Sequence, residues 1–264
     1  MLILIASGYE QLSEWAARIV AKAIRNKPNL VLGLAAGSTP LGTYRELVRL
    51  YKEGAVDFRD VVTFNLDEYL GLPATHPQSY HHFMKTALFD HINIKPANIH
   101  IPDGSIEANL EAYCASYERA IQEAGGLDLQ ILGIGRHAHI GFNEPGSSLR
   151  SRTRIKTLTE QTREDNRRFF APGERAPEAA ITVGVATIME ASRILLLASG
   201  EHKANAIAKA IEGPVSASAS ASALQLHADV TVVVDEDAAR ELQEKDYYRR
   251  VAEMTARLTP ERLW

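Results

Sequence analysis

The stretch Leu30-Val31-Leu32-Gly33-Leu34-Ala35-Ala36-Gly37-Ser38-Thr39-Pro40 runs from an apolar segment through a turn of small residues into the start of a helix. Unbroken apolar runs are typical of strands that are buried on both faces, and proline suits the first turn of a helix. Similar runs recur, with amphipathic segments between them, at Leu2–Ile5, Val61–Leu66, Leu127–Ile134, Ala180–Val183, Ile194–Ala198 and Val230–Val234. This rhythm predicts a mostly parallel sheet covered by helices on each side, a three-layer α/β fold.

Helical periodicity is readable between these runs, with boundaries uncertain by about 2–4 residues. The expected helices are Gln11–Arg25, Leu41–Lys52, Ile106–Glu123, Lys203–Ile211 and Ala238–Arg257. The biased stretch Ser216–Ser222 is too short, and too closely followed by apolar residues, to be a disordered linker. With neither a linker nor a repeat along the chain, we predict one domain spanning residues 1–264.

The composition argues against several classes of partner. The 264 residues carry a net charge of −4, which offers no long-range attraction for nucleic acid or an anionic membrane surface. The N-terminal residues lack the basic start and long apolar core of a signal peptide, and no stretch is long enough to span a bilayer. Cys114 is the one cysteine, so we expect a buried, inert thiol. We expect a cytoplasmic protein with neither nucleic-acid nor membrane partners.

The turn after the second apolar run is a candidate anion site. In open parallel sheets, ligands bind beyond the carboxyl ends of the strands. The small residues up to Gly37 let backbone N–H groups approach an anion, and Ser38 and Thr39 can cap the helix or donate hydrogen bonds. An ordinary capped turn between strand and helix is the alternative. The turn is not a Walker loop, because the spacing and the Gly-Lys pair are absent.

Two adjacent carboxylates, Asp67 and Glu68, follow the run Val61–Leu66. Carboxylates in an apolar stretch are expensive to bury unless they are paired or perform proton chemistry. One of the two is therefore a candidate base. The alternative is a helix N-cap followed by an acidic first turn.

The segment LGIGRHAHIGFNEP, after the next apolar run, admits three interpretations. In the first, Gly133, Gly135 and Ala138 match a relaxed dinucleotide-binding fingerprint. That motif needs a helix directly afterwards, which Gly141 and Pro145 disfavour, so a nucleotide site is the least favoured interpretation.

The other two interpretations concern the histidines of this segment. His137, His139 and Glu144 resemble the cupin metal motif, but that fold is all-β, so we favour no metal site. Further ligands for such a site would come from His76, His81 and His82. We favour His139 as an acid/base whose charge state is set by a nearby carboxylate, with Glu144 the first candidate. A histidine whose hydrogen bonds are satisfied in a tight loop is the alternative.

Four motifs together resemble the glucosamine-6-phosphate deaminase family: FNLDEYLGLP, HPQSY, LGIG…HIGFNEPGSSL and SRTRIKTL. The resemblance extends from Leu32 to His227, which is nearly the whole chain, and these long motifs are more specific than the short patterns. It implies a Rossmann-like subunit that converts glucosamine 6-phosphate and water to fructose 6-phosphate and ammonia. It implies no metal and no nicotinamide, so we expect no cofactor.

The resemblance implies a role for each matching residue. Asp67 matches the carboxylate that moves a proton between carbon 2 and carbon 1 of the open sugar. His139 matches the residue that opens the pyranose ring, and Glu144 matches its carboxylate partner. The family's phosphate ligands match Gly37, Ser38, Thr39, Arg168 and Lys203. Arginine and lysine give a bidentate fork and a point charge for a dianion, although a solvated helix face is the commoner role of each alone.

One departure from the family affects the catalytic set. Here His137-Ala138 precedes His139, where the family has Asp or Asn followed by Gly. We therefore include His137 among the catalytic residues and expect a reduced rate. Two alternatives stay open, a catalytically weakened sugar-phosphate sensor and a 6-phosphogluconolactonase-like hydrolase. The preference between glucosamine and galactosamine 6-phosphate also stays open, because the two differ at one hydroxyl.

A second, regulatory site is also expected. Ser147, Arg154, Lys156 and Thr157 gather hydroxyls and cations in one segment, as an oxyanion site requires, although an exposed charged strand is the alternative. In enteric-type family members, matching positions bind N-acetylglucosamine 6-phosphate between the subunits of a hexamer, together with an aromatic that corresponds to Tyr247. The resemblance thus implies a homo-oligomer that this compound activates.

Overall fold

The structure is a computed structural model that describes residues 1–167, 170–171 and 173–262. Its strands are β1 (Leu2–Ala6), β2 (Val31–Leu34), β3 (Val62–Asn65), β4 (Asp67–Tyr69), β5 (Ile99–His100), β6 (Leu129–Leu132), β7 (Arg154–Thr157), β8 (Ala179–Thr182), β9 (Ile194–Ala198) and β10 (Val230–Asp235). Its α-helices are α1 (Tyr9–Asn26), α2 (Ser38–Lys52), α3 (Tyr80–Ala87), α4 (Leu110–Glu123), α5 (Glu160–Arg167), α6 (Val185–Met189), α7 (Ala204–Ile211) and α8 (Lys245–Leu258).

A parallel sheet of seven strands forms the middle layer, in the order β1-β10-β9-β6-β2-β3-β5. Six of the seven predicted strands lie in it. Their residues are buried because helices cover both faces, which is why these strands read as unbroken apolar runs.

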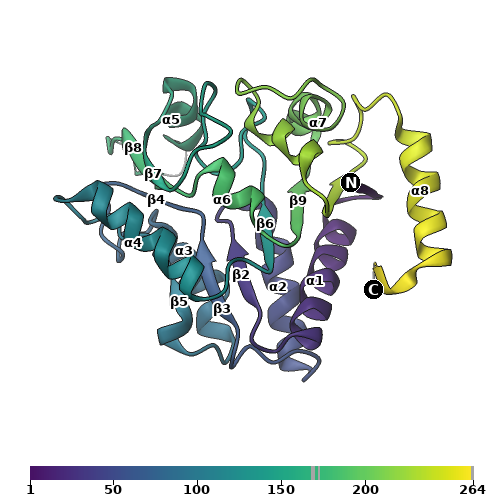
Figure 1. Ribbon diagram of the computed structural model, residues 1–264, viewed down its shortest axis with the longest axis horizontal. Helices are drawn as coiled ribbons and strands as arrows, with labels where there is room; N and C mark the ends of the chain where they lie inside the picture. The colour runs from purple at the N-terminus through teal and green to yellow at the C-terminus, as the bar shows by residue number, and fades with distance from the viewer. Residues whose placement is uncertain (168–169, 172, 263–264) are drawn as a thin grey trace.

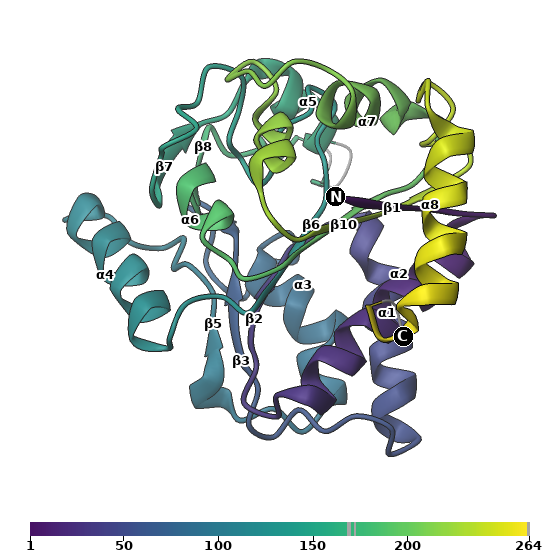
Figure 2. The same ribbon diagram turned by 45° about the vertical axis from the view of Figure 1, so that its right-hand side comes forward.

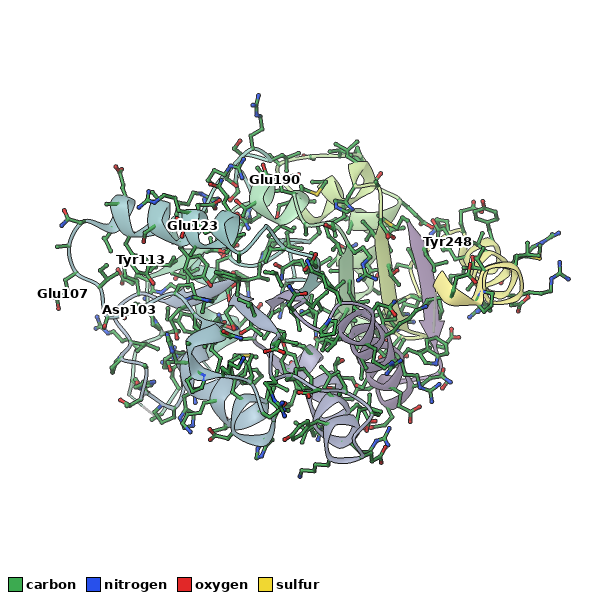
Figure 3. The ribbon with its side chains drawn as sticks, turned by 60° about the horizontal axis from the view of Figure 1, so that its bottom comes forward. Asp103, Glu107, Tyr113, Glu123, Glu190 and Tyr248 are labelled. Carbon is green, nitrogen blue, oxygen red and sulfur yellow. The ribbon has the colours of Figure 1, made fainter. Side chains whose placement is uncertain are left out.

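A hydrophobic core cluster lies on each face of the sheet. The first cluster packs one face against α1, α2 and α3. The other joins the opposite face to α4, α6 and α7. Figure 3 shows the sheet between these layers, with Glu123 and Glu190 marking the α4 and α6 side. The chain therefore has the predicted α/β, Rossmann-like, three-layer fold.

The strand order reverses direction between β2 and β6. From β2 the chain continues outward to β3 and β5, whereas from β6 it continues the other way to β9 and β10. The loops that leave the carboxyl ends of these two strands diverge, which opens the crevice where open α/β sheets bind ligands.

The prediction for Ala180–Val183 was wrong in one respect. This run forms β8, but β8 pairs antiparallel with β4 and β7 in a separate sheet of three strands. A short apolar run carries no information about the direction of its partner. The second sheet and α5 lie at one end of the molecule, whereas α8 stands at the opposite side (Figures 1 and 2).

The two largest differences between expected and observed helix boundaries are at the starts of α8 and α4. α8 begins at Lys245 rather than Ala238, and α4 begins at Leu110 rather than Ile106. Three helices of five to eight residues, α3, α5 and α6, were not predicted.

Two smaller expectations are confirmed. Cys114 is buried in α4, and burial raises the pKa of its thiol. The stretch from Ser216 is ordered and leads into a 3-10 helix, Ser220–Leu226, whose first residues are buried. No helix within the described residues is long and apolar enough to cross a membrane.

Candidate active site

The turn after β2 forms one wall of the candidate site. Gly37 directly precedes α2, and the space where a side chain would lie at Gly37 is open. The Tyr9 hydroxyl donates to the Ser38 carbonyl at 3.0 Å and accepts from the Gly42 N–H at 2.7 Å, so it holds the start of α2 in place. Because the N–H groups of a first helical turn lack intrahelical partners, this turn can bind an anion through Gly37, Ser38 and Thr39.

Asp67 begins β4, immediately after the central strand β3 ends. Its side chain is buried, and its carboxyl has no hydrogen-bond partner among the residues that the structure describes. Burial, reinforced by the neighbouring Glu68 carboxyl, raises the pKa of Asp67 to about 8. A carboxyl with these properties is suited to accept and return a proton near neutral pH.

Glu68 has a structural role, which resolves the choice between the two carboxylates. Its carboxylate accepts the backbone N–H groups of Tyr69 at 2.8 Å, Tyr80 at 3.0 Å and His81 at 3.0 Å. Tyr80 and His81 are the first residues of α3, so Glu68 caps this helix. Asp67 is therefore the candidate base. The alternative, that this segment is a helix N-cap with an acidic first turn, is wrong, because Asp67–Tyr69 is a strand and Glu68 binds the start of the distant α3.

The loop after β6 places His139 and Glu144 together. Both are buried, and His139 Nδ1 lies 3.4 Å from Glu144 Oε2. Burial lowers the pKa of His139, and the Glu144 charge opposes this effect. The imidazole packs on the backbone of Gly135, where a Cβ atom would lie 2.0 Å from the ring. The structure thus brings His139 and Glu144 together, and their acid/base role stays a prediction.

The same loop passes directly over Asp67. A Cβ atom at Gly141 would lie 3.4 Å from Asp67 Oδ2 and 2.9 Å from Thr182 Oγ1, and Gly141 has a φ of +55°. Only glycine meets both requirements without strain. This close approach brings the His139 loop and the Asp67 carboxyl into one site.

Three residues that hold this loop were missed by the sequence analysis. Asn143 donates to the carbonyls of Ile140 and Val183, each at 2.9 Å. Ser220 donates to the Asn143 carbonyl at 2.9 Å. Thr159, which precedes α5, donates to Glu144 Oε1 through its N–H and its hydroxyl, both at 3.3 Å. Apart from Ile140, these partners are distant in sequence, so no local pattern could reveal them.

His137 and Ala138 stand where the family has Asp or Asn followed by Gly. His137 is exposed, and its charge lowers the pKa of His139 further, after burial and alongside Lys203. Ala138 is buried with a φ of +54°, a left-handed conformation that costs alanine about 1–2 kcal/mol. Glycine relieves this strain, which gives a physical reason for glycine at that position in the family.

Lys203 approaches the same loop from the carboxyl end of β9. Its Nζ donates to the Ile134 carbonyl at 2.7 Å, and its charge contributes to lowering the pKa of His139. The predicted phosphate ligand Lys203 therefore lies beside the catalytic loop. Arg168, the other basic ligand, lies outside the described residues.

Comparisons with known proteins show the family of the chain. Residues 6–233 match the family described as glucosamine-6-phosphate isomerases/6-phosphogluconolactonase. The chain belongs to this family. A glucosamine-6-phosphate deaminase of Shewanella loihica is 53% identical over 251 residues, covering 95% of this chain and 93% of that protein. A second, of Thermoanaerobacter pseudethanolicus, is 52% identical over 246 residues, covering 93% and 97%.

Solved structures of the isomerase/phosphogluconolactonase family give the same fold. A monomeric glucosamine-6-phosphate deaminase is 48% identical, with a TM-score of 0.88, covering 91% of this chain and 100% of that chain. The 6-phosphogluconolactonase of Trypanosoma brucei has a TM-score of 0.71 at 20% identity, covering 91% and 98%. At this low identity the second likeness concerns the fold alone.

The residues that were predicted to bind an activator lie only partly together. Side chains alternate along β7, so Arg154 and Lys156 share one face and Thr157 faces the other way. Arg154 donates to Asn143 Oδ1 at 2.9 Å and lines a cavity of about 640 Å³ between α4 and β7. Ser147 is buried, next to the loop that carries Glu144.

Tyr247 lies far from this cluster. It is exposed on α8, at the opposite side of the molecule from β7 in both views (Figures 1 and 2). A regulatory site that combines β7 with Tyr247 therefore requires a second copy of the chain.

The histidines of the alternative metal site point to different partners. His76 Nε2 lies 2.6 Å from Glu174 Oε1, and His81 Nε2 lies 3.2 Å from the Pro102 carbonyl. Within the described part of the chain, no group of three or more His, Cys, Asp or Glu side chains is arranged to hold a metal ion. The residues present therefore do not fit the cupin-like arrangement.

Proposed function

We propose that this chain isomerises and deaminates glucosamine 6-phosphate to fructose 6-phosphate and ammonia. One observation carries the proposal: a buried carboxyl, Asp67, lies against Gly141 in the loop that presents His139 and Glu144. The relatives that are about 50% identical over nearly their whole length are glucosamine-6-phosphate deaminases, which supports the same activity here.

Each step uses a residue of this site. The turn at Gly37 and Lys203 hold the phosphate, so that binding energy far from the reacting carbons orients the sugar. His139, paired with Glu144, transfers the proton that opens the pyranose ring. Asp67 then moves the proton of carbon 2 to carbon 1. As the amino nitrogen loses a proton and the oxygen at carbon 1 gains one, the amino aldehyde becomes an imine at carbon 2. Water adds to this imine, and ammonia leaves to give the ketone.

The electrostatics of the two catalytic groups match these roles. Asp67 must be ionised to take a proton, and a pKa raised to about 8 gives it a basicity close to neutral pH. The pKa of His139 is lowered by burial, so the imidazole can release as well as accept a proton. The exposed His137 disfavours the protonated form of His139. Ring opening should therefore be slower than it would be with a carboxylate at position 137.

An ammonia-release assay tests the proposal, with glucosamine 6-phosphate and galactosamine 6-phosphate as parallel substrates. We expect release with the glucosamine epimer and equal amounts of ammonia and fructose 6-phosphate. No ammonia, together with a ligand-induced rise in melting temperature, would instead identify a sugar-phosphate sensor. Hydrolysis of 6-phosphogluconolactone without deamination would identify the lactonase. Activity lost on chelation and restored by a divalent ion would overturn the metal-independent mechanism.

The domain, the cellular compartment and the assembly of the chain are part of the same proposal. We propose that the activity belongs to one domain of residues 1–264 in the cytoplasm, and that the chain forms a homo-oligomer activated by N-acetylglucosamine 6-phosphate. The exposed apolar side chains of α8 support an association surface. The 48% identical deaminase is described as a monomer, so the oligomeric state needs its own measurement.

A further inference from the structure

Asp235 is a buried carboxylate that the proposed reaction does not use. Within the described part of the chain, four acidic side chains are buried, and they are Asp67, Glu68, Glu144 and Asp235. The first three belong to the candidate site or hold the start of α3. Burial of a carboxylate costs free energy unless hydrogen bonds compensate for the lost water. The donors that bind Asp235 therefore indicate what this residue does.

Asp235 is the last residue of β10, at the edge of the sheet where ligands bind. On one side it lies opposite Ala6, the last residue of β1. On the other side Val234 lies opposite Ala198, the last residue of β9. Because the two strands are parallel and adjacent, the chain leaves β9 directly beside the Asp235 side chain.

The Asp235 carboxylate connects the two turns that follow β9 and β10. Gly200 donates its N–H to Oδ1 at 3.0 Å and to Oδ2 at 3.1 Å, and the Ser199 hydroxyl donates to Oδ2. The Ala238 N–H, in the turn after β10, donates to Oδ1 at 2.8 Å. Both oxygens thus bind donors of the protein, and the exit of β9 is held against the exit of β10.

Gly200 passes this constraint on to Lys203. It has a φ of +90°, and a Cβ atom there would lie 3.0 Å from His202 Nδ1, so glycine suits the position. The Gly200 carbonyl accepts the Lys203 N–H at 3.0 Å, within a short 3-10 helix, Glu201–Lys203, that leads into α7. Figure 1 shows α7 beyond the end of β9. Asp235 therefore holds the N–H of the residue whose carbonyl holds the backbone of Lys203.

The backbone position of Lys203 decides what its ammonium can reach. Its Nζ donates to the Ile134 carbonyl at 2.7 Å, in the loop that also carries His139. β6 and β9 are neighbours in the sheet, and Ile134 lies two residues beyond the end of β6. A lysine side chain is flexible and loses entropy when it binds an anion in one geometry. A fixed backbone at Lys203 reduces the number of positions open to the ammonium before the anion arrives.

We propose that Asp235 is a positioning residue that fixes the β9–α7 turn, Ser199–Lys203, so that the Lys203 ammonium binds the phosphate group of the substrate. This inference rests on the proposed function, because it concerns the binding of a sugar phosphate. Asp235 acts through the turn, since its oxygens bind the donors of Ser199, Gly200 and Ala238. Its effect should therefore appear in substrate affinity and not in the chemical step.

Asp235→Ala is the test, with Ser199→Ala as its matched control. Asp235→Ala removes the acceptor of the Gly200 N–H, whereas Ser199→Ala removes one donor and leaves Gly200 bound. We expect KM for glucosamine 6-phosphate to rise about tenfold in Asp235→Ala, with kcat within about twofold of wild type. Ser199→Ala should leave KM unchanged. Damage to the fold alone would lower the apparent kcat and not change KM, because KM does not depend on the fraction of active molecules.

A double-mutant cycle with Lys203→Ala shows whether Asp235 acts through Lys203. If it does, Asp235→Ala should not weaken phosphate binding further in the Lys203→Ala chain. Calorimetric titration with inorganic phosphate measures this affinity in wild type, the two single variants and the double variant. Losses of affinity that multiply in the double variant, or wild-type values of KM and phosphate affinity in Asp235→Ala, would overturn the inference.

A conservative variant covers the case in which Asp235→Ala does not fold. Asp235→Asn keeps one acceptor oxygen, so its KM and its phosphate affinity should lie between those of wild type and Asp235→Ala. If Asp235→Ala is insoluble, a wild-type KM in Asp235→Asn would overturn the inference.

Failure of the proposed function would look different. A wild-type chain that binds phosphate but releases no ammonia would refute the deaminase activity, whereas the phosphate affinities of the four chains could still be compared. A wild-type chain that is active, with an unchanged KM in Asp235→Ala, would refute only the role of Asp235.

Discussion

At the scale of single residues, Asp67 has the most clearly assigned role. Replacement by asparagine removes the base and keeps the volume and the phosphate ligands. We expect Asp67→Asn to abolish isomerisation while the affinity for the sugar phosphate stays within a few-fold. Exchange of the carbon 2 proton with deuterated solvent, followed by NMR, measures the step directly. Exchange at the wild-type rate in the variant would refute the assignment.

Asp67→Asn should also change how the stability of the chain depends on pH. The pKa of Asp67 is about 8 in the folded chain against an ordinary value of 3.8, so at intermediate pH only the folded chain retains the proton. The proton on Asp67 stabilises the folded chain. This contribution to the free energy of unfolding is complete below pH 3.8 and is lost as the pH rises through 8. Asp67→Asn should therefore gain melting temperature relative to wild type at pH 8 and not at pH 4, by roughly 2–4 °C per kcal/mol.

A further prediction at the scale of single residues concerns His137. Its charge lowers the pKa of His139, whereas an aspartate there would raise it. An exposed charge pair is worth about 0.2–1 kcal/mol, so ring opening in His137→Asp should be about 1.4- to fivefold faster, mainly through kcat. Turnover and its pH profile in wild type, His137→Asp and His137→Asn decide this, and identical profiles in all three would make His137 a spectator.

At the scale of elements, Glu68 joins β4 to the start of α3. Three backbone N–H groups lose their acceptor in Glu68→Ala, so we expect a loss of stability of at least about 3 kcal/mol. Glu68→Gln keeps one acceptor oxygen and should lie between this variant and wild type. Chemical denaturation measures the three values. A Glu68→Ala chain as stable as wild type would show that α3 does not depend on this cap.

The start of α5 supports the catalytic pair. Thr159 holds Glu144 Oε1, while Oε2 faces His139. Thr159→Val removes one hydrogen bond to a buried carboxylate, and we expect kcat to fall about tenfold with little change in KM. Thr159→Ser should restore the rate. Thr162→Val is the control, because Thr162 contacts Thr159 and not Glu144. Equal losses in Thr159→Val and Thr162→Val would assign both residues to helix capping alone.

At the scale of the whole molecule, the position of α8 bears on assembly. Figure 3 shows α8, marked by Tyr248, standing beyond the edge strand β1. Light scattering should give a multiple of the 29.0 kDa chain, and N-acetylglucosamine 6-phosphate should lower the substrate concentration at half-maximal rate. Lys156→Ala should remove this activation and keep the basal kcat. A 29.0 kDa particle with hyperbolic kinetics that ignore the activator would contradict both expectations.

The sequence alone predicted the central layer and the ends of the strands where the chemistry lies. Strands buried on both faces are mostly apolar, so β1, β2, β3, β6, β9 and β10 could be recognised as apolar runs. Because parallel strands end at one edge, the residues after these runs had to converge, which made Gly37, Asp67 and His139 candidates for one site. The family motifs then implied a role for each of them.

Only the tertiary structure decided how those candidates are divided between chemistry and support. Asp67 and Glu68 are adjacent and chemically alike, yet the N–H groups of α3 occupy Glu68 and leave Asp67 free. Thr159 carries no local signal, because it acts through Glu144, a partner fifteen residues away on another segment. The small sheet of β4, β8 and β7 was likewise unreadable. Local spacing determines which face of an element is apolar, whereas hydrogen bonds between distant segments exist only once the chain has folded.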